Sequence, residues 1–194
     1  PQVRISPSDP ITRRMAINFA APVVLTSPLR DGSLRAVASA RGTPVLLYEA
    51  GEGLRFDEMA VRAGVAGILR VMRAENMLPA KGIAESRRQP HVCSSSSWLR
   101  APVGGLLRTF RAEGETVKEG DALATVSDPF GKTEEDIIAP FDGILIGRAI
   151  LPVVNEGDAV FHLAKLMPRA IADTVEDMIT QLESDPLFDE DEII

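Results

Sequence analysis

Apolar residues in the first ninety positions follow the pattern of an α/β domain. The run Thr43–Tyr48 is bounded by Gly42 and Gly51, and a short apolar run between glycines predicts a buried strand. The Ala-rich stretch 34–41 before it predicts a short helix. The order helix then strand therefore indicates part of an α/β sheet.

A longer helix is predicted directly after this strand. Asp57 is a good N-cap. Five apolar residues then recur at i, i+4, i+7, i+8 and i+11, which places them on one helical face. These residues are Val61, Val65, Ile68, Leu69 and Met72. We expect this face to be the apolar side of an amphipathic helix.

Residues 1–90 contain too few predicted strands for a whole sheet, which normally has about five or six. We therefore interpret 1–90 as the C-terminal part of an α/β domain, and we expect the chain to begin inside that domain. Residues 80–98 are polar and irregular and end in a run of serines, which predicts a linker or exposed loop.

Residues 99–166 contain an internal repeat. Ala101–Leu107 matches Ala139–Leu145, and Val117–Ala122 matches Val154–Ala159. The offsets are 38 and 37 residues, so each half is one structural unit. Apolar alternation on both sides of each Glu-Gly-Asp turn predicts short strands. We expect two similar halves that form a small antiparallel all-β domain.

The last segment, 167–194, is predicted to be a helix followed by an acidic end. Ile171, Val175, Met178, Ile179 and Leu182 again share one helical face. The stretch 189–192 consists only of Asp and Glu. We expect a helical, acidic tail.

Composition narrows the classes of function. The net charge of −7 disfavours nucleic acid and anionic membrane as partners, and no apolar stretch has the length needed to cross a bilayer. The single cysteine, Cys93, excludes a disulfide within the chain and fits a reducing compartment. We expect a cytoplasmic protein.

Two sets of motifs resemble known families. The doubled Ala-Pro and Val-x-x-Gly-Asp pattern of 99–166 resembles the barrel-sandwich hybrid of biotinyl and lipoyl carrier domains. Before it, the stretch Gly32–Arg35, then Gly42–Gly51 and the long helix, resembles the succinylglutamate desuccinylase/aspartoacylase family. That family has a zinc-carboxypeptidase-like α/β domain followed by a barrel-sandwich-like domain, and the resemblance covers about residues 1–166.

The resemblance implies zinc-dependent hydrolysis of the amide of an N-acyl amino acid or a similar small amide. It also implies that zinc is held by a His-x-x-Glu motif and a later His, and none of these is found in this sequence. Pro1–Arg4 resembles the segment just after the last of those ligands. We therefore expect the zinc ligands to lie in an upstream half of the same protein, and this chain alone to be inactive.

The resemblance assigns a catalytic role to Glu49. In the family, the matching Glu takes a proton from the attacking water and returns it to the leaving amine. Glu49 closes the predicted strand 43–48, and ligands of open α/β sheets bind outside the carboxyl ends of strands. The alternative is a solvated Glu at the end of a strand. The neighbouring Glu52 has no family match.

Arg35 is the candidate for binding substrate, because a guanidinium binds the free carboxylate of an N-acyl amino acid with two parallel hydrogen bonds. The alternative is a solvated helix arginine. The family has an arginine in this region, although the spacing differs from that of the animal enzymes.

Four further residues could carry chemistry. His91 and His162 are the only histidines, they are 71 residues apart, and a catalytic zinc needs about three protein ligands, so we predict no metal site in this chain. Cys93 lies near His91, and an ordinary loop thiol is favoured over a nucleophile. Lys132 lies between the two halves of the repeat, where a carrier domain presents its modified lysine.

The main alternative to a deacylase is thus a non-catalytic carrier or docking module that uses Lys132. A homo-oligomer is possible under either interpretation. The sequence does not specify the acyl group or the amino acid.

Overall fold

The computed structural model describes residues 1–86 and 89–166. They form two compact units, an N-terminal unit, Pro1–Ser94, and a second unit that begins at Ser95. The predicted helix and acidic end at 167–194 lie outside the described residues. None of the described helices has the length and apolar character needed to span a bilayer.

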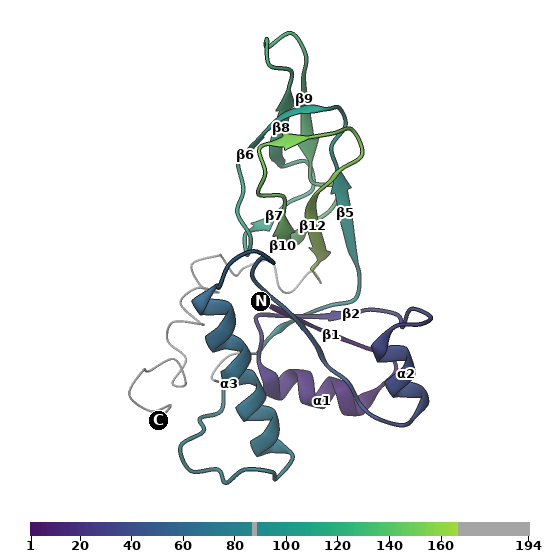
Figure 1. The fold of residues 1–194 in the computed structure, drawn as a ribbon, viewed down its shortest axis with the longest axis vertical. Helices are drawn as coiled ribbons and strands as arrows, with labels where there is room; N and C mark the ends of the chain where they lie inside the picture. Colours follow the sequence, from purple (N-terminus) through teal and green to yellow (C-terminus); the bar gives the residue numbers. More distant parts are fainter. Residues whose placement is uncertain (87–88, 167–194) are drawn as a thin grey trace. The chain divides into compact units, whose positions relative to one another are not determined.

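The N-terminal unit is a mixed α/β sheet with helices on one face (Figure 1). Its strands have the order β3-β1-β2-β4, with β1, β2 and β4 parallel and β3 antiparallel to β1. The elements in chain order are β1 Gln2–Ile5, α1 Pro10–Phe19, β2 Val23–Thr26, α2 Leu34–Ala40, β3 Leu47–Glu49, α3 Glu58–Ala74 and β4 His91–Cys93. The α/β class predicted for this region is confirmed.

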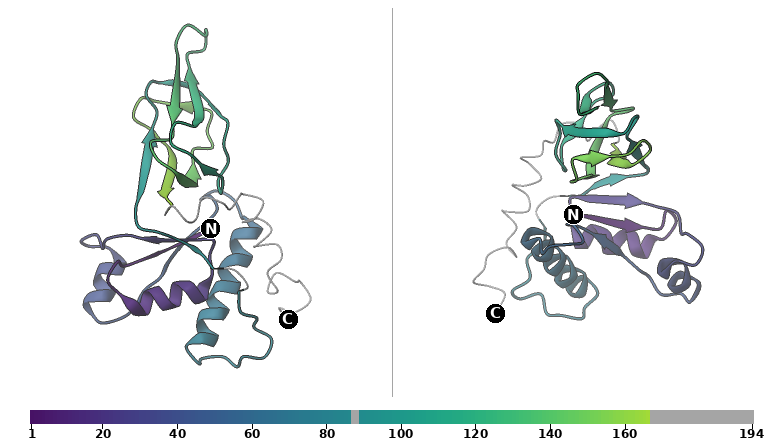
Figure 2. Two further views of the ribbon diagram at one scale, coloured as in Figure 1. Left: turned by 180° about the vertical axis from the view of Figure 1, so that it is seen from behind. Right: turned by 45° about the horizontal axis from the view of Figure 1, so that its top comes forward.

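Strand β1 has two different faces because successive side chains alternate. Val3 and Ile5 are buried in a cluster with Ala16 and Phe19 of α1. Gln2 and Arg4 therefore point to the opposite face of the sheet. Both views in Figure 2 show α1 and α3 on one side of the strands, which leaves the other face for polar groups.

The predicted buried strand 43–48 is wrong in position and burial. The strand is Leu47–Glu49, and residues 43–46 have no regular structure. It lies at the end of the described strand order and pairs only with β1. Leu46 and Tyr48 pack against the helix-side cluster, whereas Leu47 is 38% exposed on the other face. An edge strand needs only one apolar face.

The predicted short helix is confirmed as α2, and the predicted long helix is confirmed as α3 with the Asp57 side chain accepting from the Ala60 N–H at 3.0 Å. The predicted apolar face of α3, however, is not the face that packs in the described structure. Val61, Val65 and Ile68 are exposed, and the buried residues are Ala63, Gly64, Ala66, Gly67 and Arg70.

Small residues bring α3 close to its neighbours. A Cβ on Gly67 would lie 2.4 Å from the ring of Phe19, and one on Gly64 would lie 3.0 Å from Tyr48. Larger side chains would be crowded at Gly64 and Gly67, and the aliphatic Val61, Val65 and Ile68 lie on the exposed side of the helix.

The predicted linker 80–98 contains structure at its end. β4 pairs with β2, and β5 Ser96–Arg100 pairs with β12 Ala159–Lys165. The serine run from Ser95 onward therefore belongs to the start of the second unit.

The second unit consists of two antiparallel four-stranded sheets, in the orders β5-β12-β10-β7 and β11-β6-β8-β9. The remaining strands are β6 Gly105–Thr109, β7 Thr116–Val117, β8 Ala122–Ser127, β9 Glu134–Ile138, β10 Gly143–Arg148 and β11 Val153–Val154. The predicted all-β character of residues 99–166 is thus confirmed.

The repeat explains this topology. Each half supplies a long strand, a two-residue strand and a second long strand, namely β6, β7, β8 and β10, β11, β12. The short strand of each half pairs with the other half: β7 with β10, and β11 with β6. One core forms between the sheets from Leu107, Leu123, Val126, Leu145, Val160, Phe161 and Leu163. The halves are therefore interlocked rather than side by side.

Candidate functional site

Glu49 lies at the end of β3, beside the start of β1. Its register partner is Gln2, because β3 runs antiparallel to β1. The end of β3 therefore lies at the amino ends of β1 and β2, not at their carboxyl ends, where ligands of open α/β sheets usually bind. The side chain is on the face opposite α1 and α3, together with Gln2 and Arg4.

Two hydrogen bonds and an ion-pair contact converge on Oε2 of Glu49. Arg4 donates from Nε at 3.0 Å and its Nη2 lies 2.8 Å away, while Gln2 donates from Nε2 at 3.2 Å. The exposed fractions of the Arg4 and Glu49 side chains are 18% and 40%, so the ion pair is partly buried. Among the described residues, no donor is bonded to Oε1 of Glu49.

Gln2 brings a second polar group to this face. It is only 6% exposed, and its Oε1 is buried without a hydrogen-bond partner among the described residues. Buried polar atoms in native proteins normally have a partner, so this unpaired acceptor beside the Glu49 carboxylate is an exception.

The charge of Arg35 interacts with the charges of Arg4 and Glu49. It lies on α2, which begins after the N-cap Ser33, and its Nη2 donates to the Ser27 carbonyl at 2.9 Å. Burial lowers the pKa of Arg35 below its usual value, the positive charge of Arg4 lowers it further, and the negative charge of Glu49 opposes both. The charges of Arg4 and Glu49 therefore both act on Arg35, which lies 14 positions before Glu49 in the sequence.

Arg4 and Gln2 are the residues that sequence reasoning missed. A signal for them exists in the sequence, because polar Gln2 and Arg4 alternate with apolar Val3 and Ile5. This alternation is typical of a strand with one polar face. Glu52 lies apart from the group and forms an ion pair with Arg55.

A pocket of the N-terminal unit lies away from Glu49. That pocket has a volume of about 410 Å³. It is lined by residues of α1, the end of α3 and the loop that follows, including Ile17, Asn18, Arg70, Arg73 and Gln89, and by neither Glu49 nor Arg35.

No group of three or more His, Cys, Asp or Glu side chains within the described ranges could hold a metal ion. The Cys93 thiol is fully buried, and burial raises its pKa to about 11, so it is protonated and a poor nucleophile. The described residues therefore do not fit a zinc site.

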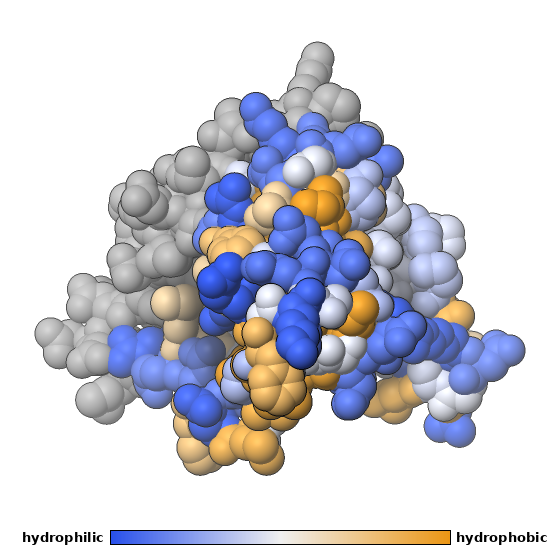
Figure 3. Space-filling model, turned by 90° about the horizontal axis from the view of Figure 1, so that it is seen from above, coloured by the Kyte–Doolittle hydropathy of each residue, from blue (hydrophilic) through white to orange (hydrophobic). Residues whose placement is uncertain are grey.

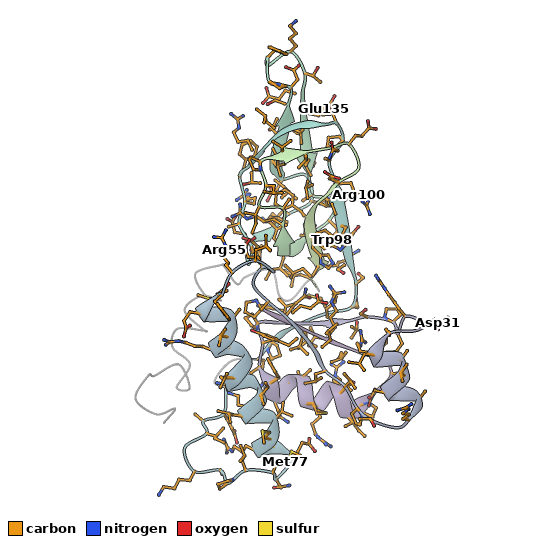
Figure 4. The ribbon with its side chains drawn as sticks, viewed as in Figure 1. Asp31, Arg55, Met77, Trp98, Arg100 and Glu135 are labelled. Atoms are coloured by element: carbon orange, nitrogen blue, oxygen red, sulfur yellow. The ribbon has the colours of Figure 1, made fainter. Side chains whose placement is uncertain are left out.

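His162 is a structural histidine. It is 4% exposed, its Nε2 lies 2.9 Å from Ser96 Oγ, and its ring stacks on Trp98 with centroids 4.4 Å apart. Trp98 is labelled on β5 in Figure 4. These contacts join β5 to β12.

Lys132 lies in the turn between β8 and β9, at the predicted place between the two halves. Asp128 organises this turn, because its carboxylate accepts backbone N–H groups of Phe130, Lys132 and Thr133. These bonds hold the pKa of Asp128 below its usual value, although partial desolvation opposes the shift.

The described residues thus combine a mixed α/β sheet with a pair of antiparallel sheets, in which each half of the repeat pairs with the other half. No protein-family model matches the chain, and no curated protein matches its sequence. Solved structures do match. One is the succinylglutamate desuccinylase/aspartoacylase from Rhodobacter sphaeroides, with a TM-score of 0.71, 21% identity, and coverage of 86% of this chain and 53% of that one.

Two further solved structures give the same result. The ectoine utilization protein EutE (DoeB) from Ruegeria pomeroyi has a TM-score of 0.74 at 17% identity, covering 84% of this chain and 54% of that one. A succinylglutamate desuccinylase from Silicibacter has a TM-score of 0.64 at 18% identity, with 85% and 53% covered. The chain spans about half the length of these structures and has the fold of their C-terminal portion.

Proposed function

We propose that this chain supplies the proton-transfer and carboxylate-binding residues of an amide hydrolase of the succinylglutamate desuccinylase/aspartoacylase type. The observation that carries the proposal is the group formed by Glu49, Arg4, Arg35 and the unpartnered Oε1 of Gln2. The fold shared with the solved structures supports it. The substrate class is an N-acyl amino acid or a similar small amide.

Glu49 acts as the general base and then the general acid. Its Oε1 takes a proton from water as the water oxygen attacks the amide carbonyl, and it returns that proton to the departing amine nitrogen. Arg4 fixes the carboxylate through Oε2 and is a positioning residue in this scheme. The described residues form no zinc site, so the metal that the resemblance implies would be held by other residues of the protein.

Arg35 binds the substrate carboxylate. Replacing Arg35 with Ala should raise KM for an N-acyl amino acid at least about tenfold, because a charge-assisted contact contributes about 1.5–3 kcal/mol, and should change kcat less. The assay measures amine release by the protein that carries this chain with whatever sequence precedes it in its gene. An amide that lacks the carboxylate should show no such change.

Arg41→Ala is the matched control, since Arg41 is an exposed arginine at the end of α2. If Arg35→Ala and Arg41→Ala shift KM equally, Arg35 does not bind the carboxylate.

The 194-residue chain alone should hold no stoichiometric zinc and release no amine from N-acyl amino acids, since the described residues lack a ligand set. Elemental analysis of purified, dialysed chain gives the zinc content. About one tightly held zinc per chain would show that ligands are present and would overturn the proposed division of the site.

The carrier alternative rests on the position of Lys132 in the β8–β9 turn. Its neighbours in the sequence are Gly131 and Thr133. The intact mass of the chain from its native source separates the two functions, because a carrier would show a mass increment at Lys132.

A further inference from the structure

Gln2 carries a buried polar atom that the fold does not explain. An isolated exposed apolar residue is ordinary, and Figure 3 shows apolar patches separated by hydrophilic residues on the face drawn there. A buried polar atom without a hydrogen bond is uncommon. Gln2 is 6% exposed, and its Oε1 has no hydrogen-bond partner among the described residues. The amide group of Gln2 therefore requires a reason other than packing.

The register between β1 and β3 explains how two side chains reach Glu49. Gln2 lies directly opposite Glu49, whereas Arg4 lies opposite Leu47 and is thus a diagonal neighbour. In an antiparallel pair, Cβ atoms directly opposite each other are about 5 Å apart, and diagonal ones are about 7–8 Å apart. The shorter amide side chain spans the first distance, and the longer arginine side chain spans the second.

Both side chains use the same oxygen of Glu49. Gln2 donates from Nε2 to Oε2 at 3.2 Å, and Arg4 donates from Nε to Oε2 at 3.0 Å, with its Nη2 2.8 Å from the same atom. Arginine often binds a carboxylate through both oxygens by two parallel hydrogen bonds. Here, within the described ranges, Oε1 of Glu49 accepts no hydrogen bond and is not a buried unpaired atom, so it remains open to solvent.

We propose that Gln2 is a positioning residue for Glu49, which it holds through its Nε2–H while its own Oε1 is left unpaired. In the proposed function, on which this role depends, Glu49 transfers a proton through Oε1. The terminal torsion of a glutamate is broad and roughly two-fold, so a carboxylate without fixed partners exchanges its two oxygens. Gln2 and Arg4 together hold Oε2, which leaves Oε1 as the oxygen that meets the attacking water.

Folding and catalysis then place opposite demands on Gln2. An unpaired buried acceptor destabilises the folded state, because the atom loses its hydrogen bonds to water. Methionine is also unbranched and flexible, and it lacks the amide. Features that oppose stability are expected at functional sites. Replacement of Gln2 by Met therefore separates a role in positioning from a role in stability.

Gln2→Met should lower kcat at least about tenfold in the protein that includes this chain and its preceding sequence, because misplacement of a reacting group by about 1 Å can cost about 100-fold. KM for an N-acyl amino acid should change less than about threefold, since Gln2 does not contact substrate in this role. The urea midpoint of unfolding should stay within about 0.5 M of wild type, because removal of the unpaired acceptor offsets loss of the bond to Glu49. Amine release and urea unfolding measure these quantities.

The same substitution in a Glu49→Gln background shows whether Gln2 acts through Glu49. Residues that act as a unit have non-additive effects, so Gln2→Met should lower the remaining kcat less than about threefold. Arg4→Met removes the second donor and should lower the kcat of the wild-type protein at least about tenfold. Arg14→Met is its matched control, because Arg14 binds Glu75 in an exposed ion pair of the same unit at 2.9 Å, and kcat should stay within about twofold of wild type.

A Gln2→Met protein with kcat within about threefold of wild type, beside a strongly impaired Glu49→Gln protein, would overturn the role of Gln2 and leave the proposed function intact. An unimpaired Glu49→Gln protein would overturn the proposed function itself. Equal losses of kcat from Gln2→Met in both backgrounds would show that Gln2 does not act through Glu49. A loss of kcat accompanied by a lower urea midpoint would assign Gln2 to the stability of the fold instead.

Discussion

Replacing Glu49 with Gln should lower kcat for hydrolysis of an N-acyl amino acid at least about 100-fold, in the protein that includes this chain and its preceding sequence. General acid–base groups contribute about 10²- to 10⁴-fold. Gln keeps the shape of Glu49 and can still accept from Arg4 through its carbonyl oxygen, but it cannot take a proton from water. Steady-state kinetics of amine release measure the effect.

Zinc content should not change in this variant, because Glu49 is proposed as a base and not as a ligand. Glu52→Gln is the control, since Glu52 pairs with Arg55 outside the group around Arg4. A Glu49→Gln protein within a few-fold of wild-type kcat would remove the catalytic assignment. Loss of zinc from it would indicate a ligand or structural role instead.

The candidate site shows why sequence reasoning found only part of the group. Glu49 and Arg35 were identified as candidates because they lie in short sequence motifs that resemble those of a known family. Gln2 and Arg4 belong to a four-residue strand, and their importance comes from pairing between β1 and β3. That pairing joins residues 45 to 47 positions apart. The local pattern of apolar and polar residues therefore does not predict it.

Helix α3 shows a second limit of pattern reading. The helix and its N-cap were predicted because both are local properties of the chain. The face of the helix that packs was not predicted, because it is decided by the close approach of the Phe19 and Tyr48 rings to Gly67 and Gly64. Gly64 and Gly67 fit against Tyr48 and Phe19, whereas a valine or isoleucine face would not.

The all-β character of the second unit was predicted because its sequence contains an internal repeat, so each turn and strand signal occurs in both halves. Both halves place a turn and two long strands at the same offsets, and the pairing of each short strand with the other half follows from that symmetry. The repeat also marks Gly105 and Gly143, which occupy matching positions 38 residues apart. The sequence alone does not show why glycine is needed there.

The structure gives the reason. A Cβ on Gly105 would lie 2.3 Å from the carbonyl oxygen of Ser127, and one on Gly143 would lie 2.6 Å from that of Ala164. Ser127 and Ala164 are themselves matched residues of β8 and β12. Because the colliding atoms belong to the backbone of a paired strand, they cannot move aside without breaking the ladder.

Gly105→Ala and Gly143→Ala should therefore each lower the free energy of unfolding of the second unit by about 3 kcal/mol, the upper end of the usual range for overpacking. With a urea m-value of about 1–3 kcal/mol/M, the urea midpoint of unfolding falls by about 1–3 M. Trp98, the only tryptophan, lies in this unit and reports its unfolding by fluorescence.

Gly104→Ala is the control, since a Cβ on Gly104 would lie 3.6 Å from its nearest neighbouring atom. The free energy of unfolding of this variant should stay within about 1 kcal/mol of wild type. An unchanged midpoint for Gly143→Ala would show that β12 yields to the methyl group, and that the matched glycines are not required by close approach of the strands.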